Sequence, residues 1–485
     1  MFLSADLRSF TETSGEMTLS CKPPVMHNWL PDLDTVAGPK YRAIADAMER
    51  DILAGRLAAG TRLPPQRVLA ETLGIDLTTV SRGYGEAQRR GLIGGEGRRG
   101  SFVLTQAAGK NVELDQPVET SMNAPPQPAS NVLANAWRTA SEILLTQTSI
   151  PPPFHYQPGG GMASVRAAGA TLLQTRGIDC GVDTVVVTAG GQHGLHAIVS
   201  TALRPGDAVA VAPFTYPGFL SLARRYGLRL IPIAADKKGV LPEALAETCQ
   251  REKIKGLYVI PTNDNPTTAT MDLARREAIA QVAARADLIV IEDDAYGLLP
   301  EAPIASLASL IPDRTFHICS TSKIISPGLR IAWVRAPDIG AAWHLATDLH
   351  ETAIMAPPFN AAVVAVWLET GDFWRLAQEV RSEVRARQEL VAAALTPGSY
   401  RTQAYGYHLW LPLLPGSDPA IIIDTLRPYG LSLSASDAFA VDKASAPHGL
   451  RVTTGGLISG DALTSALSLL REVATGSATQ KFSLV

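Results

Sequence analysis

Short apolar runs alternate with stretches of helical character through most of this 485-residue chain, and this alternation restricts its fold more than any other feature. Each run is short and apolar at nearly every position, as in a strand that is covered on both faces. The runs are Thr184–Thr188, Ala208–Ala212, Leu228–Ile233, Gly256–Ile260, Leu288–Glu292, Thr315–Cys319 and Ile331–Val334. Because strands that alternate with helices form mostly parallel sheets, we predict an α/β domain from about residue 131 to the end.

A different pattern precedes this region. From Pro39 onward, apolar side chains recur at spacings of three and four on one helical face, until Gly55 ends the helix. Two shorter helical stretches follow, Gln66–Leu73 and Thr78–Arg90, and a glycine-rich alternating stretch at Leu92–Leu104 indicates a β-hairpin. Three helices followed by a hairpin are the layout of a winged helix-turn-helix, which would form a separate domain.

The third helix of such a module enters the DNA major groove with its N-terminal side chains near the base edges. That end of the helix offers side chains that can donate to phosphates and bases, namely Thr78, Thr79, Ser81 and Arg82. The hairpin tip, Gly97-Arg98-Arg99-Gly100, would place two guanidinium groups near an adjacent minor groove.

The charge of the N-terminal region agrees with DNA binding but does not require it. Residues 38–104 carry eleven Lys and Arg against seven Asp and Glu, whereas the whole chain has a net charge of −3. The alternative is that the arginines are solvated surface charge and that the helices form a protein-interaction module.

Several short strings in this region resemble the GntR-type winged helix. They are Gly55-Arg56-Leu57, Gly60-Thr61-Arg62-Leu63-Pro64-Pro65-Gln66-Arg67, Leu69-Ala70, Thr79-Val80 and Gly100-Ser101-Phe102-Val103. The resemblance implies that Arg67 contacts the DNA backbone, and Arg62 of the same run is assigned to the DNA face with it. Asp76 stands where a serine or threonine is usual, although it can still serve as a helix N-cap. Gly83 and Gly85 would weaken the third helix by about 1 kcal/mol each relative to alanine.

In the α/β region, polar motifs follow five of the predicted strands. Ala189-Gly190-Gly191-Gln192 would open a helix whose backbone amides can bind a phosphate, and Tyr216 lies where an α/β sheet binds its ligands. The other motifs are Asn265-Pro266, the segment from Asp293 to Tyr296, and the segment from Ser320 to Arg330 that contains Lys323. Each has an ordinary alternative: a turn, a packed ring, a metal ligand or helix cap, or a surface lysine.

Taken together, these motifs supply what pyridoxal 5'-phosphate needs from a protein. A lysine must form an imine with the aldehyde, and a carboxylate must hold a proton on the ring nitrogen. Donors must fix the ring oxygen, an aromatic side chain must cover the ring, and a helix N-terminus with an arginine must hold the phosphate.

The stretch from about Tyr156 to Gly456 resembles the fold type I aminotransferases. The resemblance implies that Lys323 is the Schiff-base lysine, that Asp293 pairs with the ring nitrogen, and that Tyr216 stacks on the ring. It also implies that Asn265 and Tyr296 hold the ring oxygen. The implied phosphate-binding residues are Gly191, Gln192, Ser320, Ser322 and Arg330. Arg451, in Gly449-Leu450-Arg451-Val452, would grip a substrate carboxylate. One departure is Thr268, where the family usually has glycine.

With both parts considered, the chain from Gly38 onward resembles the MocR/GabR-type regulators. We expect an arm at residues 1–37 to which no structure is assigned, a winged helix at 38–104, a linker at 105–111 and the cofactor domain at 112–485, with a smaller C-terminal α+β subdomain. The resemblance implies a homodimer that binds double-stranded operator DNA and senses a small amino compound or pyridoxal phosphate itself. The alternative is a working aminotransferase that carries a DNA-binding module.

Other classes are disfavoured by composition. The four cysteines, Cys21, Cys180, Cys249 and Cys319, are scattered and suggest neither a disulfide framework nor a metal site. Residues 1–20 contain three acidic side chains and lack the apolar run of a signal peptide. The sequence has no uncharged apolar stretch of membrane-spanning length, so we expect a cytoplasmic protein.

Overall fold

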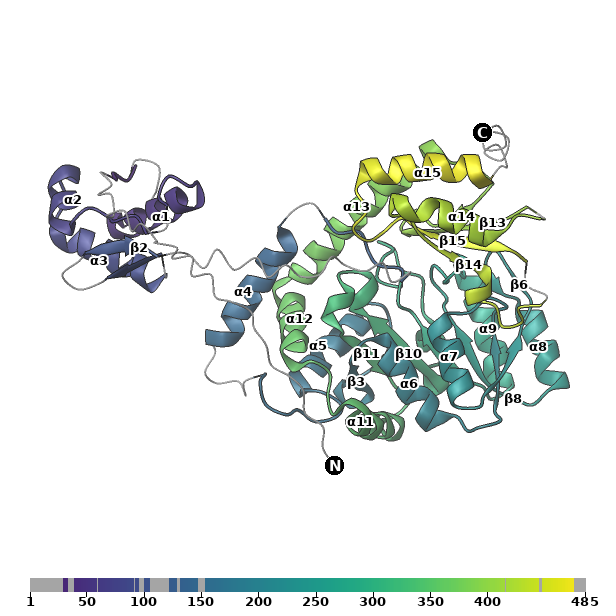
Figure 1. Cartoon of the computed structure of the whole chain (residues 1–485). Coiled ribbons are helices and arrows are strands. Elements are labelled where there is room, and N and C mark those ends of the chain that lie inside the picture. The colour runs from purple at the N-terminus through teal and green to yellow at the C-terminus, as the bar shows by residue number, and fades with distance from the viewer. Residues whose placement is uncertain are drawn as a thin grey trace, which may run out of the picture. The chain divides into compact units, whose positions relative to one another are not determined.

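The computed structural model divides the chain into two compact units, residues 1–118 and 119–485 (Figure 1). It describes residues 29–33, 39–58, 60–90, 92–95, 100–104, 122–128, 131–146, 153–414, 416–444 and 447–474. The expected linker at 105–111 and the expected domain start at 112 lie outside the described residues. The proline-rich segment 122–128 belongs to the second unit.

The N-terminal unit has the helices and the hairpin of a winged helix-turn-helix, as predicted. The elements are α1 (Lys40–Leu53), α2 (Gln66–Leu73), α3 (Leu77–Arg89), β1 (Ile93–Gly95) and β2 (Ser101–Val103). β1 and β2 pair antiparallel. α2 ends at Gly74 in a left-handed conformation, and Asp76 then caps α3 by accepting from the Thr78 amide at 2.7 Å.

Gly83 explains why α3 can lie close to α1. A Cβ atom at this position would come within 3.0 Å of the Ile44 Cβ and of the Tyr41 carbonyl oxygen. The glycine that weakens the helix locally therefore permits the contact between the two helices. The next residue, Tyr84, donates from its buried hydroxyl to the Pro64 carbonyl at 2.8 Å. This bond connects α3 to the turn before α2.

The second unit contains a seven-stranded sheet in the order β3-β11-β10-β9-β8-β4-β5. The strands are β3 (Val185–Thr188), β11 (Ala332–Arg335), β10 (Thr315–Ser320), β9 (Ile289–Asp293), β8 (Ile254–Val259), β4 (Ala208–Val211) and β5 (Arg229–Pro232). All seven predicted strands are present. β11 pairs antiparallel with both of its neighbours, and the other pairs are parallel, so the prediction of a mostly parallel sheet is confirmed.

Alternate residues of the strands enter two different cores. Val209 and Val211 of β4 belong to the larger hydrophobic cluster, whereas Ala208 and Ala210 belong to the smaller one. Because successive strand residues point to opposite faces, the sheet is covered on both sides. The helices of this unit that precede the C-terminal subdomain are α4 (Val132–Thr146), α5 (Ala163–Gln174), α6 (Gly191–Ala202), α7 (Pro217–Arg225), α8 (Pro242–Arg251), α9 (Leu273–Arg285), α10 (Leu307–Leu310), α11 (Ile339–Ala353) and α12 (Pro358–Thr370).

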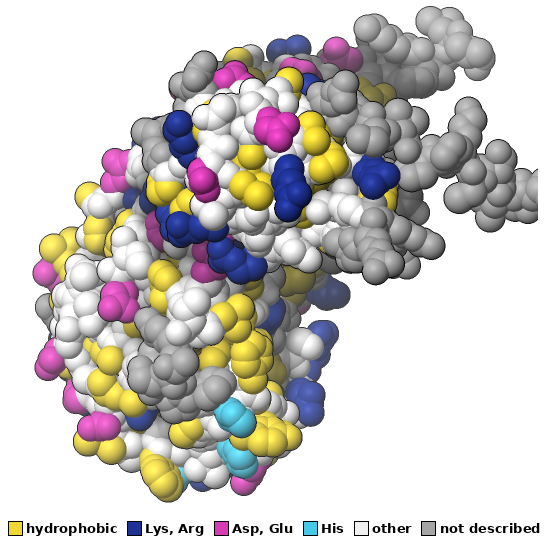
Figure 2. Space-filling view, turned by 90° about the vertical axis from the view of Figure 1, so that its left-hand side faces the viewer, with side chains coloured by type: hydrophobic (Ala, Val, Ile, Leu, Met, Phe, Trp, Pro, Cys, Tyr) yellow, Lys and Arg dark blue, Asp and Glu magenta, His cyan; other side chains and the backbone are white. Residues whose placement is uncertain are grey.

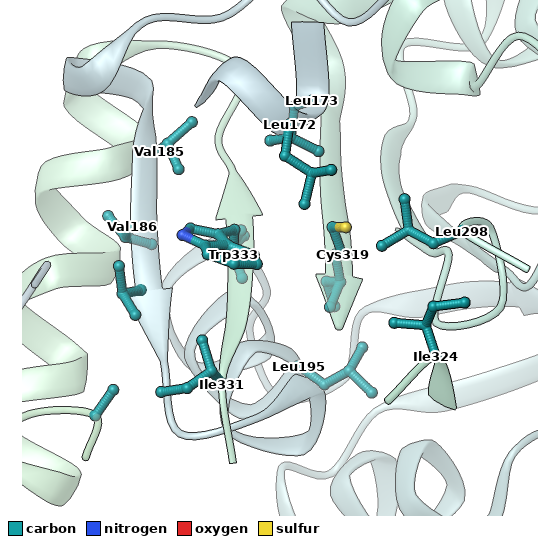
Figure 3. Close-up of a cluster of buried hydrophobic side chains, with 14 of the residues drawn as sticks. Leu172, Leu173, Val185, Val186, Leu195, Leu298, Cys319, Ile324, Ile331 and Trp333 are labelled. Atoms are coloured by element: carbon teal, nitrogen blue, oxygen red, sulfur yellow. The ribbon is translucent and has the colours of Figure 1, made fainter. Parts of the chain in front are cut away.

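Trp333 of the antiparallel strand β11 occupies the centre of the larger core, among Val185, Val186 and Leu172 (Figure 3). Its indole nitrogen donates to the Val165 carbonyl at 3.0 Å. A Cβ atom at Gly169 would lie only 2.1 Å from the ring, so this glycine lets α5 pack directly on the indole.

A smaller α+β subdomain closes the chain, as predicted. It has an antiparallel sheet in the order β12-β13-β15-β14. Its elements are α13 (Asp372–Ala394), β12 (Arg401–Thr402), β13 (His408–Pro412), α14 (Pro419–Leu426), β14 (Ser432–Ala435), β15 (Gly449–Thr453) and α15 (Gly460–Ala474). Among the described residues, no helix has the length and apolar character needed to cross a bilayer.

Candidate functional site

The predicted cofactor residues of the second unit meet at the carboxyl ends of the parallel strands. β3 leads into Gly190 and α6, β4 into Tyr216, β8 into Asn265, β9 ends at Asp293, and β10 ends at Ser320. This is the edge at which open α/β sheets bind ligands.

Lys323 lies in a 3-10 turn (Thr321–Lys323) that directly follows β10. Its amine donates to the backbone carbonyl of Asn123. Desolvation, helped by the positive charge of Arg451, lowers the pKa of Lys323 from 10.5 to about 8, against the opposing influence of Asp293. The amine is therefore deprotonated far more readily than a surface lysine, which is what a nucleophilic lysine requires.

Asp293 is held by a residue that the sequence analysis did not identify. The Tyr258 hydroxyl donates to the Asp293 carboxylate at 2.8 Å, and the Tyr258 ring stacks on Phe219 with centroids 3.8 Å apart. Burial raises the pKa of Asp293 to about 6, while the hydrogen bond from Tyr258 and the charge of Lys323 oppose the rise. Tyr258 occupies an apolar strand, where a tyrosine is indistinguishable from a packed core residue in sequence.

Arg451 and Asn265 contact each other directly. Arg451 donates to the Asn265 side-chain oxygen at 3.0 Å and to the Ser434 hydroxyl at 3.1 Å, and its guanidinium lies over the Phe439 ring at 5.1 Å. Tyr296 accepts a hydrogen bond from the Asn123 side-chain amide at 2.9 Å. The predicted pair of Asn265 and Tyr296 is thus built into two neighbouring networks, one with Arg451 and one with Asn123.

The residues expected to hold a phosphate surround the start of α6. Arg330 donates to the Ala189 carbonyl at 2.8 Å, and its guanidinium lies against Gly190, whose positive φ of 82° favours glycine. The Ser320 hydroxyl lies beside Gly191 and accepts from the Ser322 amide at 3.2 Å.

Two buried polar atoms of this group have no hydrogen-bond partner within the described part of the chain. They are the Ser322 hydroxyl oxygen and the Gln192 side-chain oxygen; the Gln192 amide itself donates to the Gly218 carbonyl at 3.1 Å. Buried polar groups are normally satisfied, so the orphaned Ser322 hydroxyl, which can donate beside an arginine and a helix N-terminus, fits a phosphate ligand, whereas the Gln192 oxygen only accepts and does not. The donor set of the chain is therefore compatible with the phosphate of pyridoxal 5'-phosphate.

Tyr216 stands at the N-terminal end of α7, close to Gly218, where a Cβ atom would lie 2.3 Å from the tyrosine ring. Burial raises the pKa of the Tyr216 phenol, and the negative charge of Asp293 raises it further. The positive charges of Arg330 and Arg451 act in the opposite direction. These mutual influences place Tyr216 inside the same group of charged side chains.

Two further residues of the site were missed by the sequence analysis. The Tyr407 hydroxyl donates to the Lys323 carbonyl at 3.1 Å. His408 donates from Nε2 to the Asp264 carbonyl at 3.1 Å, so its Nδ1 accepts from the Asn123 amide at 2.9 Å. Tyr407 directly precedes β13 and His408 is its first residue, so both belong to the C-terminal subdomain, and no local sequence pattern predicts that this subdomain lies near Lys323.

Thr268, the departure from the family pattern, adopts a positive φ of 63°. This is the left-handed region that glycine occupies without cost and that β-branched residues avoid. The loop therefore keeps the backbone conformation that a glycine would favour, and its Thr268 carbonyl is fixed by the Gln403 amide at 2.7 Å.

A cavity of about 790 Å³ adjoins the site on the side of Tyr258. Phe214, Trp410 and Asp264 contribute to its walls, whereas Lys323, Asp293 and Arg451 do not. We assign the chemistry to Lys323 and its neighbours rather than to this cavity, because the perturbed charged groups converge at Lys323.

In the N-terminal unit, the predicted DNA-contacting side chains lie on α2, on α3 and beside the hairpin. Arg67, Thr78, Ser81 and Arg82 are exposed. The Arg82 guanidinium lies 4.5 Å from the centre of the Tyr41 ring, and the Ser81 hydroxyl donates to Gln66 at 2.7 Å.

The Thr78 hydroxyl donates to the capping Asp76, so part of its hydrogen-bonding capacity serves the helix. Thr79 and Arg62 are half-buried, and Arg62 forms an isolated β-bridge with Phe102 of the hairpin. Arg98 and Arg99 lie outside the described residues.

Some arginines of this unit form ion pairs with carboxylates, and the predicted DNA-contacting arginines that the structure describes do not. Arg56, Arg89 and Arg90 each pair with a carboxylate of the same unit. Among the described residues, Arg62, Arg67 and Arg82 form no such pair, so their charge is available to an external anion. Basic, acidic and apolar side chains are interspersed on the face shown in Figure 2, so this face carries no field of a single sign.

Comparison with known families agrees with this division. Residues 117–453 match the family of class I and II aminotransferases, and residues 40–103 match the gntR family of bacterial regulatory proteins. The fold of the second unit is that of Pyrococcus horikoshii kynurenine aminotransferase, with a TM-score of 0.67 and 23% identity over 77% of this chain and 94% of that one.

The chain also aligns with regulators over most of its length. It is 29% identical to the HTH-type transcriptional regulator YdeF of Bacillus subtilis, over 92% of this chain and 96% of YdeF. It is 26% identical to the vitamin B6 salvage pathway transcriptional repressor PtsJ of Salmonella typhimurium, over 86% and 95%. It is 28% identical to the pyridoxine biosynthesis regulator PdxR of Corynebacterium glutamicum, over 81% and 87%. The chain thus belongs to the class I and II aminotransferase family and, with its gntR-type unit, is a helix-turn-helix transcriptional regulator of the MocR type.

Proposed function

We propose that this regulator binds pyridoxal 5'-phosphate at Lys323 and uses the site to sense an amino compound or the cofactor itself. The observation that carries the proposal is the convergence of a lysine of lowered pKa, a buried carboxylate and an arginine-flanked helix N-terminus at one sheet edge. The gntR-type unit on the same chain supports a regulatory use of that site.

Each residue has a defined task in this proposal. Lys323 supplies the amine, Asp293 pairs with the ring nitrogen, and Tyr258 holds the Asp293 carboxylate in place. Tyr216 covers the ring, and Asn265 and Tyr296 fix the ring oxygen. The phosphate is bound by Gly191, Gln192, Ser320, Ser322 and Arg330. When bound, the cofactor supplies a carbonyl that condenses with amines and a ring that accepts electrons.

The effector site adjoins the cofactor residues. Arg451 is positioned by Asn265 and Ser434 and can bind a carboxylate in two-point fashion. An amino compound that also carries a carboxylate therefore fits the site. It would act as a switch only if it binds more tightly to one arrangement of the DNA-binding units than to the other. The names of PtsJ and PdxR favour vitamin B6 supply as the regulated process, with the cofactor as its own signal.

A homodimer follows from the DNA-binding mode. Helix-turn-helix proteins bind two half-sites through two copies, and symmetric dimers are the commonest oligomers. We therefore infer that two copies of the N-terminal unit contact one double-stranded operator in the cytoplasm.

The cofactor is tested by the visible absorbance of the purified protein after addition of pyridoxal phosphate. Lys323→Ala is expected to abolish the band of the lysine-bound cofactor while leaving the far-UV circular dichroism unchanged. Lys238→Ala, at an exposed lysine paired with Asp272, is the matched control and should keep the band. An unchanged band in Lys323→Ala would exclude Lys323 as the attachment point.

The regulatory function is tested by footprinting the region upstream of its own gene, with and without pyridoxal phosphate and a panel of amino acids, beside a transaminase assay. A footprint that changes with one of these compounds supports regulation. The residues for transamination are also present, so rapid turnover together with a footprint indifferent to every compound would favour a working aminotransferase instead.

A further inference from the structure

The segment 122–128 is the first described part of the second unit, and residues 105–121 separate it from the hairpin of the winged helix. It contains Asn123, which is only 3% exposed although it belongs to no helix or strand. We call residues 122–128 the strap. Any signal that passes along the chain from the cofactor site to the DNA-binding unit passes through this segment.

Asn123 contacts the cofactor site with both its backbone and its side chain. Its carbonyl oxygen accepts from the Lys323 amine. Its side-chain amide donates to the Tyr296 hydroxyl and to Nδ1 of His408, each at 2.9 Å. Burial lowers the pKa of His408 to about 3, so this histidine stays neutral and its Nδ1 remains an acceptor. The Asn123 side chain is thereby fixed independently of the lysine.

The rest of the strap is held by the loop after β15. The Gly456 amide donates to the Ala124 carbonyl at 3.0 Å, and a Cβ atom at Gly455 would lie 1.9 Å from the same carbonyl oxygen. The strap is therefore packed against the C-terminal subdomain on one side and tied to Lys323 on the other. Of the polar contacts that position it, the one to Lys323 changes when the lysine reacts.

The change follows from the chemistry of the amine. When an aldehyde condenses with the Lys323 amine, a carbon–nitrogen double bond forms and the aldehyde oxygen leaves as water with the two hydrogens of the neutral amine. The nitrogen then has no N–H unless it is protonated again, and its geometry is set by the new double bond. The Lys323 amine donates to the buried Asn123 carbonyl, and a buried carbonyl that loses its donor is unfavourable, so the carbonyl gains by moving.

We propose that Asn123 senses whether Lys323 is free or modified and that the strap transmits this state to the DNA-binding unit. With a free amine, the Lys323–Asn123 bond holds the strap down. With a modified amine, that bond is lost and the strap is held less tightly, by the remaining bonds of Asn123 and Ala124. This inference depends on the proposed attachment of pyridoxal phosphate to Lys323 and adds to it the route by which the DNA-binding unit responds.

The proposal is tested on the full chain with a spin label at position 122, because Met122 is 59% exposed at the start of the strap. The label is attached to Met122→Cys in a background with Cys21→Ser and Cys249→Ser, since Cys180 and Cys319 are buried. Label mobility and DNA affinity are measured before and after addition of pyridoxal phosphate, and cofactor uptake is followed by absorbance. In the otherwise unaltered chain, the cofactor is expected to increase mobility and to shift DNA affinity.

Asn123→Ala keeps the carbonyl but removes the side-chain bonds to Tyr296 and His408 that position it, so the strap should already be mobile without cofactor and both responses to the cofactor should be at least fivefold smaller. Gln127→Ala, in the same strap, is the matched control and should respond like the unaltered chain. Lys323→Met lacks the N–H donor, so without any cofactor its label should already be as mobile as in the loaded protein. This last comparison does not depend on cofactor binding by a variant.

The results separate this proposal from the proposed function. A label that is equally immobile in cofactor-free Lys323→Met and in the cofactor-free unaltered chain would overturn the strap proposal, as would full responses in Asn123→Ala. If the unaltered chain takes up no cofactor, the proposed function fails and the strap proposal fails with it. If it takes up cofactor and shifts DNA affinity without a change at position 122, only the strap proposal is refuted.

Discussion

At the scale of single residues, the proposed cofactor site combines two opposite pKa shifts. Burial lowers the pKa of Lys323 to about 8 and raises that of Asp293 to about 6, so each group shifts toward its neutral form. The charged forms of the two side chains nevertheless attract each other, so each partly offsets the pKa shift of the other. A site of this kind has an amine that can react and a carboxylate that becomes fully charged when a cationic ring nitrogen arrives.

The pH dependence of cofactor uptake should follow Lys323. Because the neutral amine is the nucleophile, the rate of pyridoxal phosphate uptake should rise with pH and level off above about 8. Arg451→Gln removes a positive charge that lowers the pKa of Lys323, so the midpoint should move to higher pH. Stopped-flow absorbance measures the rate, with Arg285→Gln, at an exposed end of α9, as the control. A midpoint near 10.5 in the unaltered protein would contradict the lowered pKa.

The lowered pKa of Lys323 also makes the free energy of unfolding depend on pH. The folded-state pKa of Lys323 is lower than its value of 10.5 in an unfolded chain, so the unfolded chain binds more protons between pH 8 and 10.5. The contribution of this group to the free energy of unfolding is therefore unfavourable below pH 8 and becomes less so as the pH rises through that window.

Tyr258 should be needed for tight cofactor retention although it was not predicted as a site residue. Tyr258→Phe removes the hydrogen bond to Asp293 while keeping the ring stacked on Phe219. A hydrogen bond to a charged group contributes about 1.5–3 kcal/mol, so pyridoxal phosphate should bind roughly tenfold to a hundredfold more weakly. Equilibrium dialysis provides the affinity, and Tyr226→Phe, which loses a bond to His196, is the control. Equal affinities in the two variants would show that Asp293 does not need its tyrosine.

At the scale of elements, the strands and helices could be predicted because their signals are local. The run Ile289–Asp293 is apolar until its last two residues, and α2 has the predicted bounds Gln66–Leu73. The contacts of Asn123 and Tyr407 could not be predicted, since they join segments separated by 200 and 84 positions. The antiparallel direction of β11 also depends on chain crossovers that no short pattern encodes.

The two glycines of α3 show how packing modifies a local expectation. Gly85→Ala should stabilise the N-terminal unit by about 0.5–1 kcal/mol, because a Cβ atom there meets nothing within 4 Å and alanine favours the helix. Gly83→Ala should instead destabilise it, because the new Cβ would press on Tyr41 and Ile44 of α1. Calorimetry of the full chain measures both. Stabilisation by Gly83→Ala as large as by Gly85→Ala would disprove the close contact between α1 and α3.

At the scale of the whole molecule, DNA binding is assigned to a small unit and chemistry to a large one, each with its own hydrophobic core. The excess of basic residues lies in residues 38–104, so the rest of the chain is correspondingly acidic. Non-specific attraction to DNA is therefore expected to come from few side chains. Because so few side chains contribute, removing one should have a measurable effect on the salt dependence of binding.

Truncation of Arg67 and truncation of Arg82 should change DNA binding in different ways. Arg67→Ala should weaken binding to operator and unrelated DNA alike and reduce the slope of log affinity against log salt by about one per bound copy, as for a lost phosphate contact. Arg82→Ala should reduce the preference for the operator by about 1–3 kcal/mol if, as we propose, its guanidinium, which lies over Tyr41, contacts a base. Arg89→Ala, at the far end of α3 and paired with Glu86, should change neither quantity. Anisotropy titrations at several salt concentrations provide both, and identical behaviour of all three variants would mean that the DNA-contacting face lies elsewhere on the unit.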